Sequence, residues 1–288
     1  MSAGGAAPAW RNTVRTFLGR GLLVRVCSVV IVVFVVVTLL AGVLAPYNPA
    51  AQNLTKALAP ASLAHPLGQD DLGRDVLSRI IYGGRVSLSV SILAGSLAAV
   101  VGIALGLISG YFGGSARRLI MGLTDVLLSI PSLVFSLILV AALGGGLLNL
   151  VLAIGIGMVP TYIRMTNGLA LSLRENDYVV ASRLVGQSER LILLRHLLPN
   201  CFPTLTVLYT INLGNAVLTE STLSYLGVGI SPPTASWGSM VSDFYPYLIS
   251  APALVVGPSL CIILIIVSFN VVGDGLRDAL DPRLRGRL

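Results

Sequence analysis

Residues 26–45 read VCSVVIVVFVVVTLLAGVLA, a run without a single charged side chain. A helix of about 20 apolar residues is long enough to cross the roughly 30 Å hydrocarbon core of a bilayer. Four arginines precede the run, as basic residues precede a secretory signal, but the apolar part of a signal peptide is only about 7–15 residues long. The stretch therefore predicts an uncleaved first transmembrane helix that follows a cytoplasmic tail at 1–25.

The composition of the whole chain agrees with a membrane location. Of the 288 residues 55% are hydrophobic and only 11% are charged, with a mean hydropathy of +0.88. Soluble domains carry about 25% charged residues, because water must wet their surface. The net charge of +7 comes almost entirely from arginines in short segments between apolar runs. Such placement is typical of membrane edges and disfavours binding to nucleic acid.

Five further apolar runs follow the first, at 86–110, 119–142, 147–163, 201–219 and 251–272. Glycines separate some of them, in the Tyr-Phe-Gly-Gly turn at 111–114 and the triple glycine at 144–146. The fold expected is an all-α integral membrane protein with six transmembrane helices. Its core, with the second to sixth helices, would occupy 86–274, between an extracytoplasmic loop at 46–85 and a cytoplasmic tail at 275–288.

The arginines also predict the orientation. Of 18 arginines, 15 lie in the first tail, the Arg117-Arg118 turn, the segment 164–199 and the final tail. These segments alternate with arginine-poor loops across six spans. Because cytoplasmic loops carry an excess of arginine and lysine, both termini are predicted to be cytoplasmic.

Small residues recur every four positions in the second run, at Ala98, Gly102, Gly106 and Gly110. They share one helix face, and such faces let another membrane helix approach closely. We expect a packing seam, either within the bundle or with a second subunit. Glycine is also simply common in membrane helices, and that explanation stays open.

Motifs of membrane enzymes and nucleotide sites are missing from the sequence. There is no GxxxxGK[ST] phosphate loop, and the single lysine, Lys56, lies in the predicted external loop. There is no HExxH metal motif and no GxSxG nucleophile elbow. The three cysteines show no CxxC spacing and are interpreted as small apolar residues. We expect no catalytic, cofactor-binding or metal site on this chain.

Two acidic residues fall inside predicted spans, Asp125 and Glu220. Ionisable residues at such positions are functional candidates, because a charge in lipid is costly. They could therefore line a pathway or form a buried polar site. Alternatively both lie at interfacial depth and pair locally, Asp125 with Arg118 or Arg164.

The longest predicted cytoplasmic segment, 164–199, contains two helix signals. Asp177 is expected to cap a helix with small residues at its centre, which ends at a left-handed turn on Gly186. A second helix is expected at 188–198, with Leu191, Leu194 and Leu198 on its apolar face, and Pro199 would separate it from the fifth span. The first helix either receives a close-packed partner or lies on lipid headgroups.

This segment resembles the EAA loop of permeases from binding-protein-dependent ABC importers. The family pattern is Glu-Ala-Ala, a glycine four residues later, and then an apolar residue, any residue, and Leu-Pro. The chain has Val180-Ala181-Ser182, then Gly186, then His196 through Pro199. Val180 replaces the glutamate, Ser182 an alanine and His196 the apolar residue. The residues that the resemblance assigns to the ATPase-coupling helix and its surroundings are Tyr178, Val180, Ala181, Ser182, Gly186, Arg190, His196 and Pro199.

Three other stretches resemble the C-type subunit of dipeptide, oligopeptide and nickel importers. They are HPLGQDDLGRD at 65–75, ESTLSYLGVG at 220–229 with its following prolines and Ser-Trp-Gly, and GDGLRDALDPR at 273–283. The external segment is also expected to hold a short helix at 75–82. Its aspartates and arginines either face the binding protein or the pore mouth, or form a self-satisfied network.

The resemblance implies a type I ABC importer permease with the MetI-like fold, in the plasma (inner) membrane of a prokaryote. Such a chain forms half of a pore with a second homologous permease and lays its coupling helix on one of two ATPase subunits. ATP and Mg²⁺ would be bound by those partners, and an extracytoplasmic binding protein would deliver di- or oligopeptides. A secondary transporter or channel without ATPases is the alternative.

Overall fold

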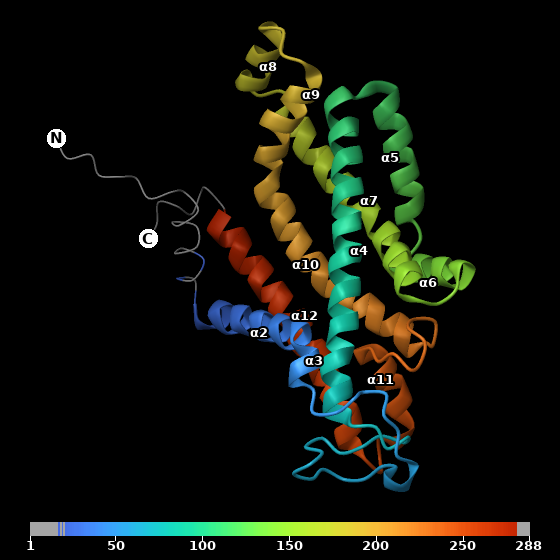
Figure 1. The fold of residues 1–288 in the computed structure, drawn as a ribbon. Coiled ribbons are helices and arrows are strands. Elements are labelled where there is room, and N and C mark those ends of the chain that lie inside the picture. Colours follow the sequence, from blue (N-terminus) through green and yellow to red (C-terminus); the bar gives the residue numbers. More distant parts are fainter. Residues whose placement is uncertain (1–16, 18, 20, 281–288) are drawn as a thin grey trace, which may run out of the picture.

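The computed structural model describes residues 17, 19 and 21–280, and the ends of both predicted tails lie outside this part of the chain. Between residues 21 and 280 the named elements are helices, and the β pairing is an isolated bridge between Gln69 and Asp75. Long helices run roughly along one direction, with α2 and α12 tilted away from the others (Figure 1). The all-helical membrane fold is thus confirmed.

Five helices are long and apolar enough to cross a membrane: α2 (Leu22–Leu39), α4 (Val76–Phe112), α7 (Leu147–Leu173), α10 (Leu198–Tyr225) and α12 (Pro252–Leu280). A sixth span results if α5 (Gly114–Leu128) and α6 (Ser132–Leu143) are counted together. These two helices meet at 90°, so the span expected at 119–142 is not one continuous helix. Pro131 supplies the physical reason, because proline disfavours helical backbone in the residue before it.

The short elements lie at the two ends of the long helices (Figure 1). At one end, the α8 end, are α8 (Asp177–Leu184), α9 (Glu189–Ile192) and the π-helical turn η2 (Leu193–Leu197). At the other, the α11 end, are η1 (Leu54–Lys56), α11 (Trp237–Phe244) and η3 (Tyr245–Tyr247). The short helix α3 (Ala41–Leu44) follows α2, and the chain changes direction between the two.

Several helices are longer than the apolar runs that predicted them. The helix expected at 75–82 is not separate but forms the first turns of α4, where the Asp75 side chain accepts a hydrogen bond from the backbone N–H of Ser78. At 1.5 Å per residue, the 37 residues of α4 span about 55 Å, more than the hydrocarbon thickness. Likewise α7 runs ten residues past 163, and α12 extends past 272 to Leu280. Arg25, expected before the first span, lies inside α2.

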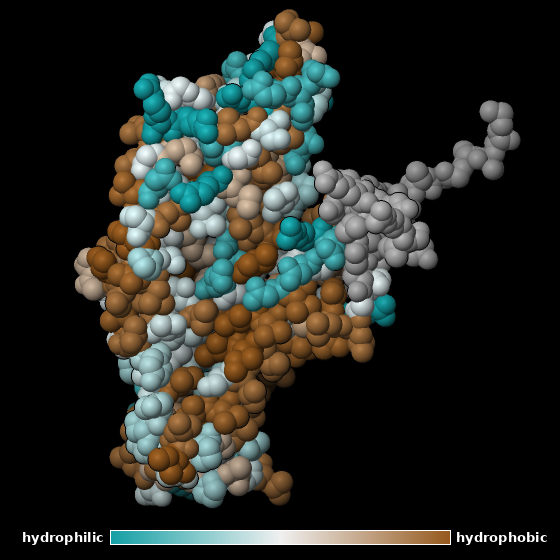
Figure 2. All heavy atoms as spheres, turned by 180° about the vertical axis from the view of Figure 1, so that it is seen from behind, coloured by the Kyte–Doolittle hydropathy of each residue, from teal (hydrophilic) through white to brown (hydrophobic). Residues whose placement is uncertain are grey.

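Large apolar side chains cover much of the outside of this bundle. On α2, Val29 and Val32 are each 60% exposed, and hydrophobic atoms form a broad band over the molecule (Figure 2). Contact with lipid or with another membrane helix accounts for such a surface, since water does not.

The glycine face of α4 packs against α7 within this chain. A Cβ on Gly102 would lie 2.4 Å from the Tyr162 Cβ, and one on Gly106 would lie 2.5 Å from the Thr166 Cβ. A Cβ on Gly110 would lie 2.6 Å from the Ala170 Cβ. The two backbones therefore approach so closely that glycine is required at all three positions.

Gly106→Ala is expected to lower the thermal unfolding midpoint of the purified subunit in detergent. The added methyl group meets a Cβ and the Ile163 carbonyl oxygen at 2.9 Å, neither of which can swing away. Overpacking of this kind costs about 1–3 kcal/mol. Gly122→Ala on α5 is the matched control, because open space surrounds that position. Equal midpoints for the two variants would contradict the close α4–α7 contact.

Candidate functional site

The helix α8 is built by local backbone signals at both ends. It begins after Asn176, whose backbone is extended, so the expectation that Asp177 caps the helix is wrong by one residue. At its other end Gly186 has a φ of +77°, the left-handed turn expected there. The Gly186 N–H donates to the Arg183 carbonyl at 2.9 Å, and the Gln187 N–H donates to the Ser182 carbonyl at 3.1 Å. These two bonds form a Schellman motif, which satisfies carbonyls at the helix end.

One face of α8 is buried and the other presents apolar groups to the outside. Val179 is fully buried with Ile192 and Leu197. On the outer side Leu184 is 83% and Val185 82% exposed, next to the exposed Val180 and Ala181. We call these four outer residues the apolar tip. Hydrophobic spheres lie among hydrophilic ones at that end of the molecule in Figure 2.

The chain after the glycine turn differs from the predicted amphipathic helix. It runs through α9 and η2 directly into α10, so Pro199 does not separate two helices but lies in the first turn of α10. The predicted apolar face is also wrong, since Leu194 is 64% exposed while Ile192 and Leu197 are buried. A π turn holds more residues than an α turn, and it shifts the helix face that points inward.

His196 of η2 contacts residues of α8 and of the turn that follows α8. Its Nε2 lies 2.9 Å from the Gln187 Oε1 and 3.5 Å from the Ser182 Oγ. Its ring centroid is 6.3 Å from that of Tyr178. The structure thus brings together three residues singled out from the sequence, Tyr178, Ser182 and His196. The other five residues that the resemblance assigned are exposed: Val180, Ala181, Gly186, Arg190 and Pro199.

Contacts that the sequence did not suggest fasten α8 and α9 to the end of α4. The Tyr111 hydroxyl donates to the Glu189 carboxylate, and the Arg183 Nε donates to the Tyr111 oxygen at 3.1 Å. The Arg183 guanidinium also lies 4.6 Å from the centre of the Tyr111 ring. Nearby, Arg174 donates to the Gly110 carbonyl at 3.2 Å. The sequence did contain a signal for these contacts, namely the opposite charges of Arg183 and Glu189 on either side of the Gly186 turn. Helix α8 is therefore in contact with α4 as well as with the segment that leads into α10.

The two acidic residues predicted inside spans have separate environments. Asp125 pairs with Arg164 at 2.5 Å, and both side chains are more than half exposed, so the local pairing holds with Arg164 and not Arg118. Glu220 is fully buried near the α11 end of α10. It accepts hydrogen bonds from the hydroxyls of Ser224 at 2.8 Å and Ser221 at 3.5 Å.

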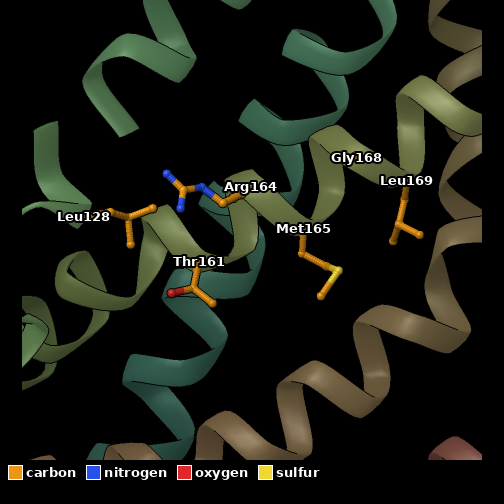
Figure 3. A pocket seen from close by; sticks show the side chains of 6 residues that line it. All are labelled: Leu128, Thr161, Arg164, Met165, Gly168 and Leu169. Atoms are coloured by element: carbon orange, nitrogen blue, oxygen red, sulfur yellow. The ribbon is translucent and has the colours of Figure 1, made fainter. Parts of the chain in front are cut away.

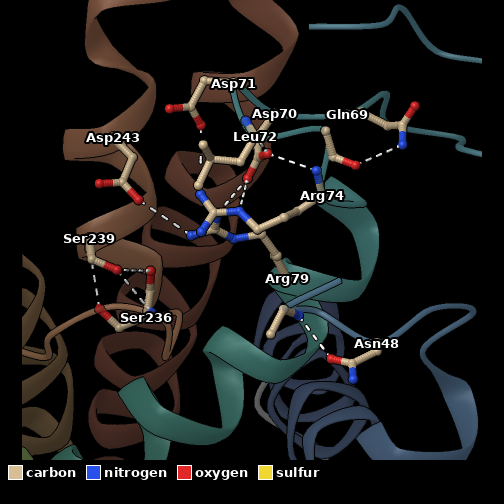
Figure 4. A network of polar contacts seen from close by, with 12 residues as sticks. Asn48, Gln69, Asp70, Asp71, Leu72, Arg74, Arg79, Ser236, Ser239 and Asp243 are labelled. Carbon is tan, nitrogen blue, oxygen red and sulfur yellow. Dashed lines mark hydrogen bonds and ion pairs between the residues drawn. The ribbon is translucent and has the colours of Figure 1, made fainter. Parts of the chain in front are cut away.

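The aspartates and arginines of the external motif form a buried network (Figure 4). Asp70 is fully buried and accepts from the Arg74 Nε at 2.6 Å and from Arg79. Arg79 also pairs with Asp243 of α11, with 3.3 Å between Nη2 and Oδ2. The Asp75 Oδ1 lies 2.9 Å from the His65 Nδ1. These side chains do pair with one another, as one of the two alternatives had it, but the network is buried and not at the surface, and the Arg79 Nε has no hydrogen-bond partner among the described residues. It joins the segment 46–75 to α4 and α11.

Apolar helices of membrane-spanning length, a helix pair bent at a proline, and a short helix held outside the bundle define a polytopic membrane transport subunit. The chain belongs to the family described as the binding-protein-dependent transport system inner membrane component, which residues 102–286 match. It is accordingly a permease of an ABC importer, a kind of subunit that does not itself hydrolyse ATP.

Relatives match over nearly the whole chain. The dipeptide transport system permease protein DppC of Haemophilus influenzae is 39% identical, over 92% of this chain and 92% of that protein. The glutathione transport system permease protein GsiD of Pectobacterium atrosepticum is 36% identical, over 96% of this chain and 92% of that protein. These two similarities reach beyond the matched family region into the first span and the external segment.

The fold also matches a solved transporter. The structure of the MetNI methionine ABC transporter in an inward-facing conformation aligns with a TM-score of 0.58 at 18% identity. The alignment covers 71% of this chain and 97% of that chain. It confirms the MetI-like fold expected from the sequence.

Proposed function

We propose that this chain forms half of the pore of an ABC importer for di- or oligopeptides and receives movement from a partner ATPase through α8. The observation that carries the proposal is the apolar tip, a set of exposed apolar side chains on a helix whose own backbone is locked by the Gly186 turn. Relatives named for dipeptide and glutathione transport support a peptide as cargo.

The apolar tip favours a protein partner over lipid headgroups. Helix α8 lies beyond the ends of the long helices and is held there by Tyr111 and His196 (Figure 1). Small Ala181 at its centre lets a partner surface approach closely. Val180, in the place of the family glutamate, adds apolar contact area where relatives of the EAA pattern offer a carboxylate.

The proposed setting is the plasma (inner) membrane of a prokaryote, with the α8 end and both termini in the cytoplasm. The distribution of arginines supports this orientation, because 15 of 18 fall on that side. The α11 end then faces outward, where a soluble binding protein would deliver cargo to the segment 46–75. A second homologous permease would complete the pore, and two ATPase subunits would bind the ATP and Mg²⁺.

Purification from the native host in mild detergent tests this assignment. A tagged chain is expected to bring down a second permease and ATPase subunits. The double variant Leu184→Asp, Val185→Asp should lose the ATPases by more than about tenfold, because carboxylates forced into an apolar interface cost well over 1 kcal/mol each. It should keep the second permease, which we expect to contact this chain outside the apolar tip.

Leu194→Asp is the control, since Leu194 is exposed and apolar but lies on η2, outside the apolar tip. Recovery of ATPases with the double variant would contradict docking through the apolar tip. Failure to recover any ATPase with the unchanged chain would contradict the importer assignment. Uptake of labelled dialanine and of glutathione into liposomes holding the complete importer then identifies the cargo class.

A further inference from the structure

Two open grooves lie along α7 and meet at Thr161. The first, about 460 Å³, is lined from α5 and α7 and includes Arg164, Met165 and Leu169 (Figure 3). The second, about 450 Å³, lies between α6, α7 and α10. Each volume falls in the range of about 300–1,000 Å³ that is usual for small-molecule sites. Since Thr161 lines both, the grooves follow one another along the bundle.

The second groove is lined by uncharged hydrogen-bonding side chains together with apolar residues such as Leu133 and Met158. On α10 they are Asn212, Asn215, Thr219 and Thr222, spaced by three and four residues and therefore on one helix face. Serines of α6 and Thr161 of α7 face them across the groove. Among the described residues, no Asp, Glu, Lys or Arg lines it.

The polar face of α10 cannot be directed at lipid. Asn212 lies at the middle of α10, the depth at which an unpaired amide is most costly in a bilayer. The Asn212 Nδ2 has no hydrogen bond of good geometry within the described residues, and neither has the hydroxyl of its polar neighbour Tyr162. Asn215 is exposed and makes only a weak 3.4 Å contact to the Asn212 Oδ1. This face must meet water, cargo or another polar surface.

The one charged residue lining the first groove is neutralised. Arg164 points across that groove toward α5 in Figure 3, and its guanidinium pairs with Asp125. Neither groove therefore presents a net charge. The Thr219 and Thr222 hydroxyls donate to backbone carbonyls of α10, so their oxygens are left to accept, while the amide of Asn215 can both donate and accept. Such groups can bond the N–H and C=O groups of a peptide backbone, whatever the charge of its side chains.

We infer that the two grooves, joined at Thr161, are this chain's part of the path along which cargo crosses the membrane, and that their hydrogen-bonding groups take the backbone amides of a peptide. The inference rests on the proposed importer function and deepens it. Asn215 and Thr219 are the residues expected to meet cargo in the outer half of α10.

Cysteine accessibility tests this path in the assembled importer. Cys27, Cys201 and Cys261 are first replaced by alanine, and Asn215→Cys or Thr219→Cys is added. A small cationic methanethiosulfonate is the probe, because it reacts only with thiols in contact with water. Thr210→Cys is the control, since Thr210 lies on the same helix but packs against Gly273 of α12. Both groove cysteines should react at least about tenfold faster than the control, and excess dialanine with binding protein should slow them.

Uptake gives a second readout. Asn215→Leu should lower dialanine uptake about tenfold, the effect of losing one or two hydrogen bonds, while Thr210→Val leaves it unchanged. Reaction of the groove cysteines as slow as that of Thr210→Cys would overturn the path. So would loss of the second permease on Asn215→Leu, which would make this face a subunit interface. If the groove cysteines react and cargo protects them, but the chain recovers no ATPase, the path is supported and the importer assignment is refuted.

Discussion

Gly186→Pro is expected to abolish peptide uptake while the subunit still inserts and its ATPase partners still hydrolyse ATP. The Gly186 φ of +77° is closed to proline, whose φ is fixed near −65°. Proline also removes the N–H that donates to the Arg183 carbonyl. The Schellman motif is then lost, so the direction of α8 relative to the segment after residue 186 is no longer fixed. Uptake and ATP hydrolysis measured in the same proteoliposomes check this uncoupling.

Gly186→Ala separates strain from loss of the hydrogen bond. A Cβ at this position meets open space, so alanine adds only the cost of left-handed backbone, about 1–2 kcal/mol, and uptake should fall partly. Normal uptake by the proline variant would refute the role of the turn.

Ala181→Trp should uncouple transport by another route, because a bulky side chain in the apolar tip keeps the partner away.

Asp70→Asn is expected to destabilise the α11 end more than any other single charge removal. Asp70 is fully buried between Arg74 and Arg79, which are themselves at most 5% exposed. Neutralising it leaves two buried guanidinium groups short of a counter-charge. Breaking a buried ion pair in this way costs about 3–5 kcal/mol. The thermal unfolding midpoint of the purified subunit, read in parallel with assembly, measures the loss.

Glu175→Gln is the matched control for that measurement. Glu175 also pairs with an arginine, Arg174 at 2.8 Å, but its side chain is 72% exposed. Exposed ion pairs contribute little because water and salt screen them. A midpoint for Asp70→Asn no lower than that for Glu175→Gln would show that Asp243 and Asp71 suffice to balance the arginines.

The sequence predicted the elements whose signals are local. The length of the apolar runs predicted the spans, and the glycines at 113–114 and 144–146 do lie where one helix ends and the next begins. The turn at Gly186 was predictable because only glycine occupies left-handed backbone without strain. The family resemblance, resting on motifs in order along the chain, is confirmed by relatives that match nearly its whole length.

The predictions that failed depended on context that local patterns do not carry. Pro131 marks the 90° bend within 119–142. Other prolines of this chain, Pro160, Pro203 and Pro258, lie inside helices, so the sequence did not show which proline breaks a span. The face of Leu191 and Leu194 assumed 3.6 residues per turn, which the π turn at 193–197 breaks. Asp75–Tyr82 was expected as a separate helix, since the charges of Arg79 and Arg85 hid its continuity with α4.

The sequence by itself therefore determined that this chain is a membrane permease, where its candidate spans lie, and that α8 ends in a turn at Gly186. The spans follow from the length of the apolar runs, the turn from the backbone freedom of glycine, and the permease assignment from the family motifs. Only the tertiary structure decided that Tyr111 holds Arg183 and Glu189, that Asp70 is buried between two arginines, and that α6, α7 and α10 enclose a polar groove. Each joins residues from different parts of the chain, so it exists only once the helices have packed together.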